Sequence, residues 1–167
     1  MPLFKAFKAP NAAISINIGK DNFVLGETIA GDVLVTSQEE FEAEEIRVEL
    51  GGVEKLKVGG EPIAEEGSET LETRIYSSRT SYTQRGDTME YPMYKGQTKV
   101  SEKLRITKGF SQQFPFKITV PAGLGPTFQG MRRDGQRLER TWMLKGVVAV
   151  GERPDVEAKG HIQVSIA

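Results

Sequence analysis

The sequence predicts an all-β fold, an immunoglobulin-like antiparallel β-sandwich, and three observations support this prediction. Apolar and polar residues alternate with a period of two along most of the chain. Glycine (18 residues) and proline (8 residues) interrupt the alternating runs at short intervals, as turns do. Helical periodicity is almost absent, and the one helix candidate, residues 38–45, lacks an apolar stripe. A chain of 167 residues can bury one core, so we expect a single domain over residues 1–167.

The alternating runs follow one another in an order that suits two packed sheets. One-sided alternation is typical of antiparallel strands with one wet face, and two such sheets bury their apolar faces against each other. Gly51 and Gly52 interrupt one run and predict a bend or a β-bulge there. The expected strands cover residues 14–18, 29–35, 46–58, 71–75, 100–106, 114–120, 142–150 and 162–166.

Residues 59–97 differ from the rest because they are rich in Glu, Ser, Thr and Arg. A structureless loop of this length is unusual in a compact domain. We therefore expect a projecting polar hairpin at about residues 70–97. This stretch holds all four tyrosines, and a tyrosine ring offers a large contact area with a polar tip. The rings either face a partner or cover the end of the sandwich, and both interpretations stay open for Tyr76, Tyr82, Tyr91 and Tyr94.

Composition excludes most enzyme and cofactor classes. The chain has no cysteine and one histidine, His161, so thiolate chemistry, disulfides and multi-histidine metal centres are ruled out within one chain. A single histidine without a nucleophile motif is expected to be a strand-end side chain. We therefore predict no enzymatic activity, no cofactor and no metal.

Net charge and hydropathy limit the classes of partner and the location that we expect. The net charge of -1 argues against nucleic acid as a partner. No run approaches the roughly 18 apolar residues of a membrane span, and the first residues lack the apolar stretch of a signal peptide. The expected location is the cytoplasm, with no integral membrane segment.

Several segments resemble the N-terminal domains of the arrestin-like family, which includes arrestins, bacterial and archaeal sporulation-control proteins and an arrestin-fold retromer subunit. Residues 25–35, LGETIAGDVLV, resemble the family segment with a Gly-Glu pair followed by Gly-x-Val. Residues 114–121, FPFKITVP, match its Phe-Pro-Phe strand, and residues 142–150 match the long strand that follows. Residues 16–24, 45–50 and 151–155 fit the family in the same order, so the resemblance covers about residues 4–166.

This resemblance implies a sandwich that serves as an adaptor and not as a catalyst. Three departures limit what it implies. Ala30 stands where arrestins place a buried acidic residue, residues 98–108 read as a strand where arrestins have a helix, and the chain has length for one domain where arrestins have two. Lys5 is the nearest match to the phosphate-sensing lysine pair, and Ala6 takes the second position. Binding of phosphorylated receptors is therefore not implied.

The leading functional prediction is a non-catalytic scaffold or adaptor module that binds protein partners through sheet edges and loops. A one-domain chain could also pair with itself as a homodimer. A basic group formed by Arg132, Arg133 and Arg137, with Arg140 nearby, is a candidate contact for an anionic partner, unless neighbouring glutamates neutralise it. The alternative function is a small-ligand or carbohydrate-binding sandwich, although Trp142 lies in an apolar run and is expected in the core.

Overall fold

The computed structural model describes residues 8–57, 83–85, 88–131 and 135–166, and these residues form strands and turns without any helix. The prediction of an all-β fold is therefore confirmed. The strands are β1 (Ala12–Ile18), β2 (Asn22–Val24), β3 (Thr28–Ser37), β4 (Phe41–Ala43), β5 (Glu45–Lys57), β6 (Thr83–Arg85), β7 (Thr88–Ser101), β8 (Leu104–Ile106), β9 (Ser111–Thr119), β10 (Phe128–Met131), β11 (Arg137–Ala149) and β12 (Val156–Ser165).

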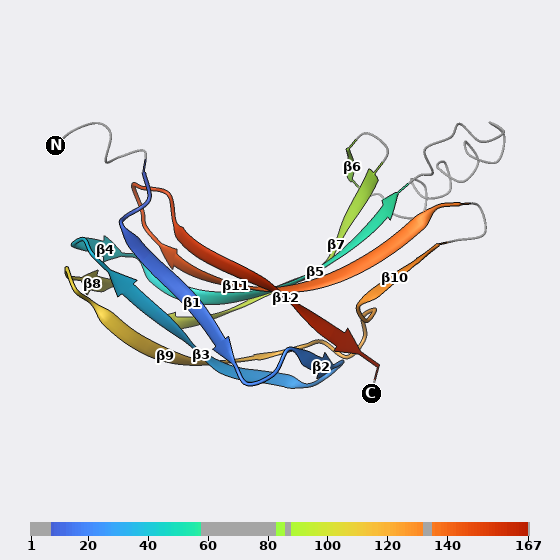
Figure 1. The fold of residues 1–167 in the computed structure, drawn as a ribbon, viewed down its shortest axis with the longest axis horizontal. Helices are drawn as coiled ribbons and strands as arrows, with labels where there is room; N and C mark the ends of the chain where they lie inside the picture. The colour runs from blue at the N-terminus through green and yellow to red at the C-terminus, as the bar shows by residue number, and fades with distance from the viewer. Residues whose placement is uncertain (1–7, 58–82, 86–87, 132–134, 167) are drawn as a thin grey trace.

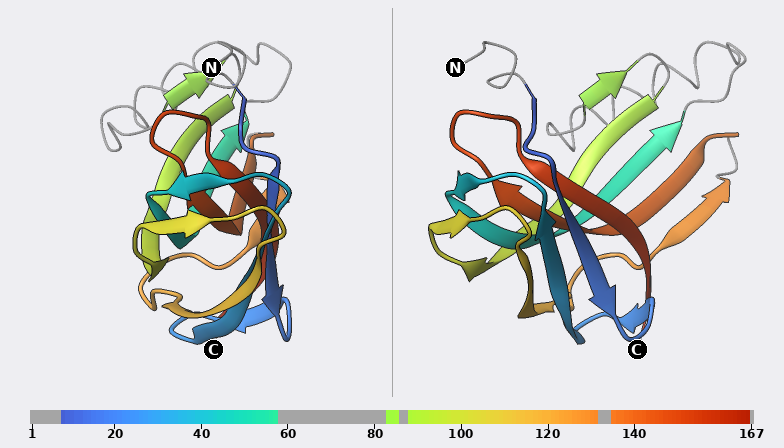
Figure 2. Two further views of the ribbon diagram at one scale, coloured as in Figure 1. Left: turned by 90° about the vertical axis from the view of Figure 1, so that its left-hand side faces the viewer. Right: turned by 60° about the vertical axis from the view of Figure 1, so that its left-hand side comes forward.

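Two sheets make the sandwich. The small sheet has the strand order β1-β3-β9, and the large sheet has the order β2-β12-β11-β5-β7-β6 with β10 added beside β11. Figures 1 and 2 show the small sheet lying across one half of the large sheet. The pairs are antiparallel except for β2 and β12, which run parallel through Gln163–Ser165. A two-stranded sheet of β4 and β8 closes one end.

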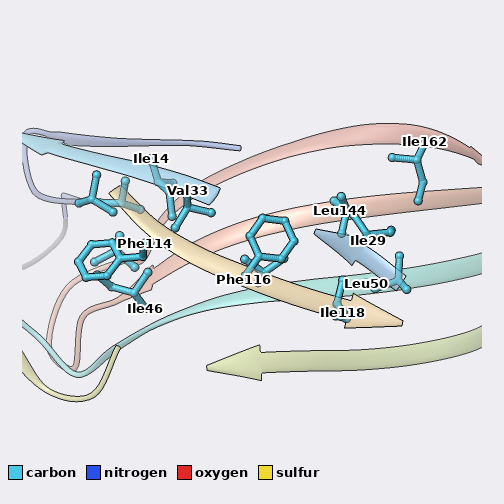
Figure 3. Close-up of a cluster of buried hydrophobic side chains, with 14 of the residues drawn as sticks. Ile14, Ile29, Val33, Ile46, Leu50, Phe114, Phe116, Ile118, Leu144 and Ile162 are labelled. Atoms are coloured by element: carbon cyan, nitrogen blue, oxygen red, sulfur yellow. The ribbon is translucent and has the colours of Figure 1, made fainter. Parts of the chain in front are cut away.

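The core lies between the two sheets, and the alternation seen in the sequence places its side chains there (Figure 3). In β5, Ile46, Val48 and Leu50 are fully buried, whereas their neighbours are only partly covered. Phe114 and Phe116 of β9 face them from the small sheet. Each such side chain contributes about 1.5–3 kcal/mol by leaving water, so this layer is the main source of the fold's stability.

Gly31 shows why β3 needs a glycine at this position. In the small sheet it lies between Ile18 of β1 and Phe116 of β9. A Cβ atom at this position would collide with the backbone oxygen of Asn17 and lie 2.8 Å from the Ile18 side chain. Because a backbone atom cannot move aside as a side-chain tip can, β3 passes here only with glycine.

The predicted irregularity at Gly51 and Gly52 is confirmed. The pairing of β5 with β7 shifts register between Gly52 and Val53. Gly52 also gives room to Trp142 of β11, whose ring atoms would lie 3.1 Å from a Cβ atom at that position. Trp142 is fully buried, as its apolar surroundings in the sequence predicted.

The predicted polar hairpin at residues 70–97 is only partly described. Residues 58–82 lie outside the described residues, whereas β6 pairs with the start of β7. The second strand of the predicted hairpin is the first part of β7. It pairs with β5, so residues 88–97 belong to the large sheet. Beyond the small sheet, the end of β5 and the starts of β7 and β11 extend together with β6 and β10 (Figure 1).

Two local expectations are corrected. Residues 98–108 are not one strand, because β7 ends at Ser101 and β8 covers only Leu104–Ile106. The helix candidate at residues 38–45 contains strand β4, where Phe41 and Ala43 are buried on one side. Their spacing of two residues, and not the polar residues between them, decided the local structure.

Candidate interaction site

The edges of the two sheets are the first features that can accept a partner. Within the described residues, β1 and β9 border the small sheet, while β12 and β10 border one side of the large sheet. Strand β2 covers β12 only at Gln163–Ser165, so no strand of the described part of the chain lies on the outer side of the earlier part of β12. An edge strand presents unpaired backbone groups that a further strand can use.

Backbone hydrogen bonds at the strand ends show which backbone groups point outward. The Gln163 N–H donates to the Asp21 oxygen, away from β11. Since backbone direction alternates along a strand, the N–H and C=O groups of Lys159 and His161 point to the same outer side. On β1, the Asn11 oxygen accepts from Gln38 beside β3. The even-numbered residues, such as Ile16, therefore direct their backbone groups to the free edge.

A groove of about 240 Å³ lies between these two edges, and we name it the β1–β12 groove. Two glycines shape it. A Cβ atom on Gly146 of β11 would lie 3.1 Å from Ile14, so β1 packs tightly there. A Cβ atom on Gly160 of β12 would meet nothing within 4 Å, so the absence of a side chain leaves an opening. The lining residues are Ile14, Ser15, Ile16, Ile18, Leu144, Ala158, Lys159, Gly160, His161 and Ile162.

The rim of the groove is polar and basic, whereas its floor is apolar. Lys159 and His161 are both exposed. The nearby Glu157 pairs with Lys145 at 3.0 Å, so its charge is already compensated. A floor of aliphatic side chains under a basic rim can hold one apolar side chain of an extended segment while the rim contacts polar or acidic groups.

Only some of the predicted site residues fall within the described parts. Arg137 is exposed at the start of β11, opposite Lys57 of β5. Tyr94 packs against Trp142 with ring centroids 6.0 Å apart, and Tyr91 packs against the small cluster of Leu56 and Met89. Both tyrosines are half-buried. The other predicted residues lie outside the described residues: Lys5, Tyr76, Tyr82, Arg132 and Arg133.

Arg140, the fourth arginine of the basic group, has a structural role. Its Nε donates to the Glu54 carboxylate at 3.3 Å, and its guanidinium lies 5.6 Å from the centre of the Phe128 ring. Only 8% of the Glu54 side chain is exposed. Glu54, on a strand far away in sequence, therefore neutralises Arg140, the fourth member of this group. No sequence spacing could reveal this pair, since 86 residues separate its members.

A second polar contact ties the first described residues to the body. Arg153 donates two hydrogen bonds to the Glu39 carboxylate, at 2.6 and 3.3 Å, and a third to the Lys8 oxygen at 2.9 Å. The Asn11 N–H also donates to Glu39. Since a bidentate arginine pair fixes direction as well as distance, this contact holds the chain at the entry to β1.

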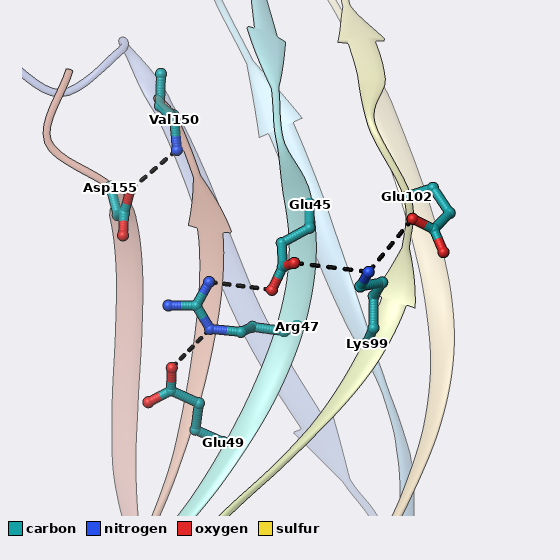
Figure 4. A network of polar contacts seen from close by, with 7 residues as sticks. All are labelled: Glu45, Arg47, Glu49, Lys99, Glu102, Val150 and Asp155. Carbon is teal, nitrogen blue, oxygen red and sulfur yellow. Dashed lines mark hydrogen bonds and ion pairs between the residues drawn. The ribbon is translucent and has the colours of Figure 1, made fainter. Parts of the chain in front are cut away.

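The outer face of the large sheet carries a network of charges (Figure 4). Arg47 donates to Glu49 at 2.7 Å and to Glu45 at 3.2 Å, and Lys99 joins the same cluster. Burial disfavours the charged guanidinium, but hydrogen bonds and charges from the two glutamates outweigh it and raise the pKa of Arg47. This face is therefore largely neutralised by its own residues.

The described residues hold no group of three or more His, Cys, Asp or Glu side chains placed to bind a metal ion. Nor does any helix in this part of the chain have the length and hydropathy needed to cross a membrane.

Comparisons with known proteins agree with the two-sheet fold described above. The family model for the arrestin (or S-antigen) N-terminal domain matches residues 13–166. Among solved structures, the sporulation control protein Spo0M from Bacillus subtilis superposes with a TM-score of 0.61 at 15% sequence identity. That match covers 94% of this chain and 50% of Spo0M, so this chain spans about half the length of that structure. A search of curated proteins finds no match.

Proposed function

Because the chain belongs to the arrestin N-terminal domain family, we propose that it is a non-catalytic adaptor module that recruits protein partners by strand addition at the β1–β12 groove. The observation that carries this proposal is the pairing of two free strand edges with an apolar opening at Gly160. Family membership supports the adaptor role, and the groove supports the mode of binding.

Each part of the groove has a role in this mode of binding. An extended partner segment would exchange backbone hydrogen bonds with one free edge, which supplies affinity without sequence preference. One apolar side chain of the segment would enter the opening at Gly160, which supplies specificity. The basic rim at Lys159 and His161 would favour a segment with acidic neighbours around that side chain.

We propose a secondary contact at the basic turn before β11. Arg137 is exposed there, next to Lys57. Together with Arg132 and Arg133 it would meet an anionic region of the partner, because guanidinium groups bind carboxylates and phosphates in a bidentate way. Replacing Arg132 and Arg133 with Glu should weaken binding to any partner found; unchanged binding would remove this turn from the site.

Site-specific photo-crosslinking tests the groove. A photoreactive phenylalanine analogue at Ser15 places the probe on the exposed side of β1, and the same analogue at Lys117 places it on β9 as a control. In a cell extract, the Ser15 probe should capture discrete protein adducts that disappear when Gly160→Leu fills the opening. Equal adducts from both probes, or adducts insensitive to Gly160→Leu, would show that partners do not use this groove.

One observation favours the alternative of a small-ligand site. A notch of about 290 Å³ lies between β10 and β12, where neither strand pairs with Thr141 of β11. Gln129, Glu139 and Gln163 line it with polar side chains. Titration calorimetry with a panel of monosaccharides, on wild type and on Gln163→Leu, tests this alternative; heat that depends on Gln163 would support it.

A further inference from the structure

We propose that β10 is a self-association edge, through which two copies of this chain pair their β10 strands in antiparallel fashion about a two-fold axis. This proposal concerns a different edge from the β1–β12 groove and does not depend on the proposed function.

The composition of the edges, taken with their exposure, distinguishes β10 from the others. Edge strands of monomeric proteins commonly carry prolines or lysines that prevent pairing with another chain. Strand β9 contains Pro115 and Lys117, and the free side of β7 contains Pro92 with Lys95 and Lys99. Strands β1, β2 and β10 contain neither a proline nor a charged residue, and of these three only β10 (Phe128–Met131) carries two exposed large hydrophobic side chains.

The side chains of β10 are also unusually exposed for their type. Phe128 is 44% exposed and Met131 is 65% exposed, and they are two of the four large hydrophobic residues that stand out on the described surface. Arg140 covers the Phe128 ring from within the same molecule. An apolar edge that is left in water is an interaction site by default.

The direction of the backbone groups shows that this edge is ready for pairing. The Thr127 N–H donates to Val164, and the Gln163 N–H points the opposite way, so even-numbered residues of β12 face β11. Trp142 therefore faces Ile162, and by alternation Arg140 faces Phe128 across the β10–β11 pair. The N–H and C=O groups of Gln129 and Met131 then point outward.

A two-fold pairing centred on Gly130 uses these groups fully. It places Gln129 opposite Met131 of the second copy and Met131 opposite its Gln129, and each pair exchanges two backbone hydrogen bonds. The two Gly130 residues face each other at the axis. Within one chain, the Phe128 ring already lies where a Gly130 side chain would be, since a Cβ there would meet the ring at 2.6 Å. The two rings would therefore cover the glycine pair together.

The absence of charge on β10 allows a second copy of the chain to bind at this edge. The strand is uncharged, and the chain's net charge of -1 produces little repulsion between two copies. Pairing between two four-residue edges buries much less surface than the roughly 800 Å² that each partner buries in a standard interface. We therefore expect a weak dimer, with a dissociation constant on the order of 100 µM.

Sedimentation velocity over a concentration series that spans this value tests the proposal. The wild-type average mass should rise toward that of a dimer with concentration. Gln129→Pro removes an outward N–H and should keep the protein monomeric, because proline is tolerated on the solvent side of an edge strand. Gln113→Pro makes the same change on the edge strand β9 and should behave as wild type.

Two further variants keep the test decisive. Met131→Lys adds a charge at an exposed edge position and should also abolish the dimer, even if Gln129→Pro unfolds the chain. The chain has no cysteine, so the double variant Gln129→Cys and Met131→Cys should form covalent dimers on mild oxidation. A wild type that stays monomeric at all concentrations, or a dimer that survives Met131→Lys, would overturn the proposal.

Discussion

Filling the opening at Gly160 should stabilise the fold, whereas the same change at Gly146 should destabilise it. Both glycines lie in strands of the large sheet and face the small sheet. A Cβ atom on Gly160 would meet nothing within 4 Å, whereas one on Gly146 would lie 3.1 Å from Ile14 and 3.3 Å from Ile16. Gly160→Val and Gly146→Val are therefore one substitution in two opposite environments.

The expected magnitudes follow from this difference. Gly160→Val gains strand propensity, loses glycine's unfolded-state entropy and covers apolar surface, for a gain of about 1 kcal/mol. In a chain of this size that gain raises the melting temperature by about 2–4 °C. Gly146→Val overpacks the contact with β1 and should cost about 1–3 kcal/mol.

Urea unfolding followed by the fluorescence of Trp142 measures both values, because this buried side chain is the only tryptophan. Gly160→Ala is the matched control and should give a smaller gain than valine. If Gly160→Val proved clearly destabilising, or Gly146→Val neutral, the account of the groove as an opening made by a missing side chain would be wrong.

Two further predictions concern charged residues. Arg140→Ala should cost about 1–3 kcal/mol in urea unfolding, because it removes both the ion pair with Glu54 and the packing of the guanidinium on the Phe128 ring. Arg137→Ala should change stability by less than about 0.5 kcal/mol, because Arg137 is exposed; similar losses in the two variants would contradict the assignment of these arginines. The pKa of Glu27 is lowered by its hydrogen bonds from Lys20 and the Val24 N–H, so its stabilising contribution is present above its unfolded-state pKa and disappears as the pH falls through the folded value. NMR titration should show the Glu27 pKa rising in Lys20→Ala, and an unchanged pKa would refute this cause.

The sequence pattern predicted the parts of the fold that depend on residues close together in the chain. The alternation in residues 46–50 and 114–120 placed the correct side chains in the core, because burial on one face of a strand enforces a period of two. Gly51 and Gly52 predicted the register shift at that point. Trp142 was predicted in the core from its apolar neighbours alone.

Features that depend on distant contacts were not predictable. Strand β10 lies partly within residues 121–130, whose prolines and glycines are typical of a bend and not of a strand, and its pairing with β11 makes it a strand. The β1–β12 groove arises where the edges of two different sheets meet. Glycine is as common in turns as beside openings, so the sequence alone does not distinguish the two at Gly160, and the opening is visible only when β1 is in place.

Hydrogen exchange on a complex with a photo-captured partner tests the central claim most directly. The account predicts that the partner slows exchange of the outward-pointing amides of one edge, either Ile16 on β1 or Lys159 and His161 on β12; within the described residues these amides have no neighbouring strand. Protection confined to other surfaces, with these three amides exchanging as fast as in the free protein, would contradict strand addition at the β1–β12 groove.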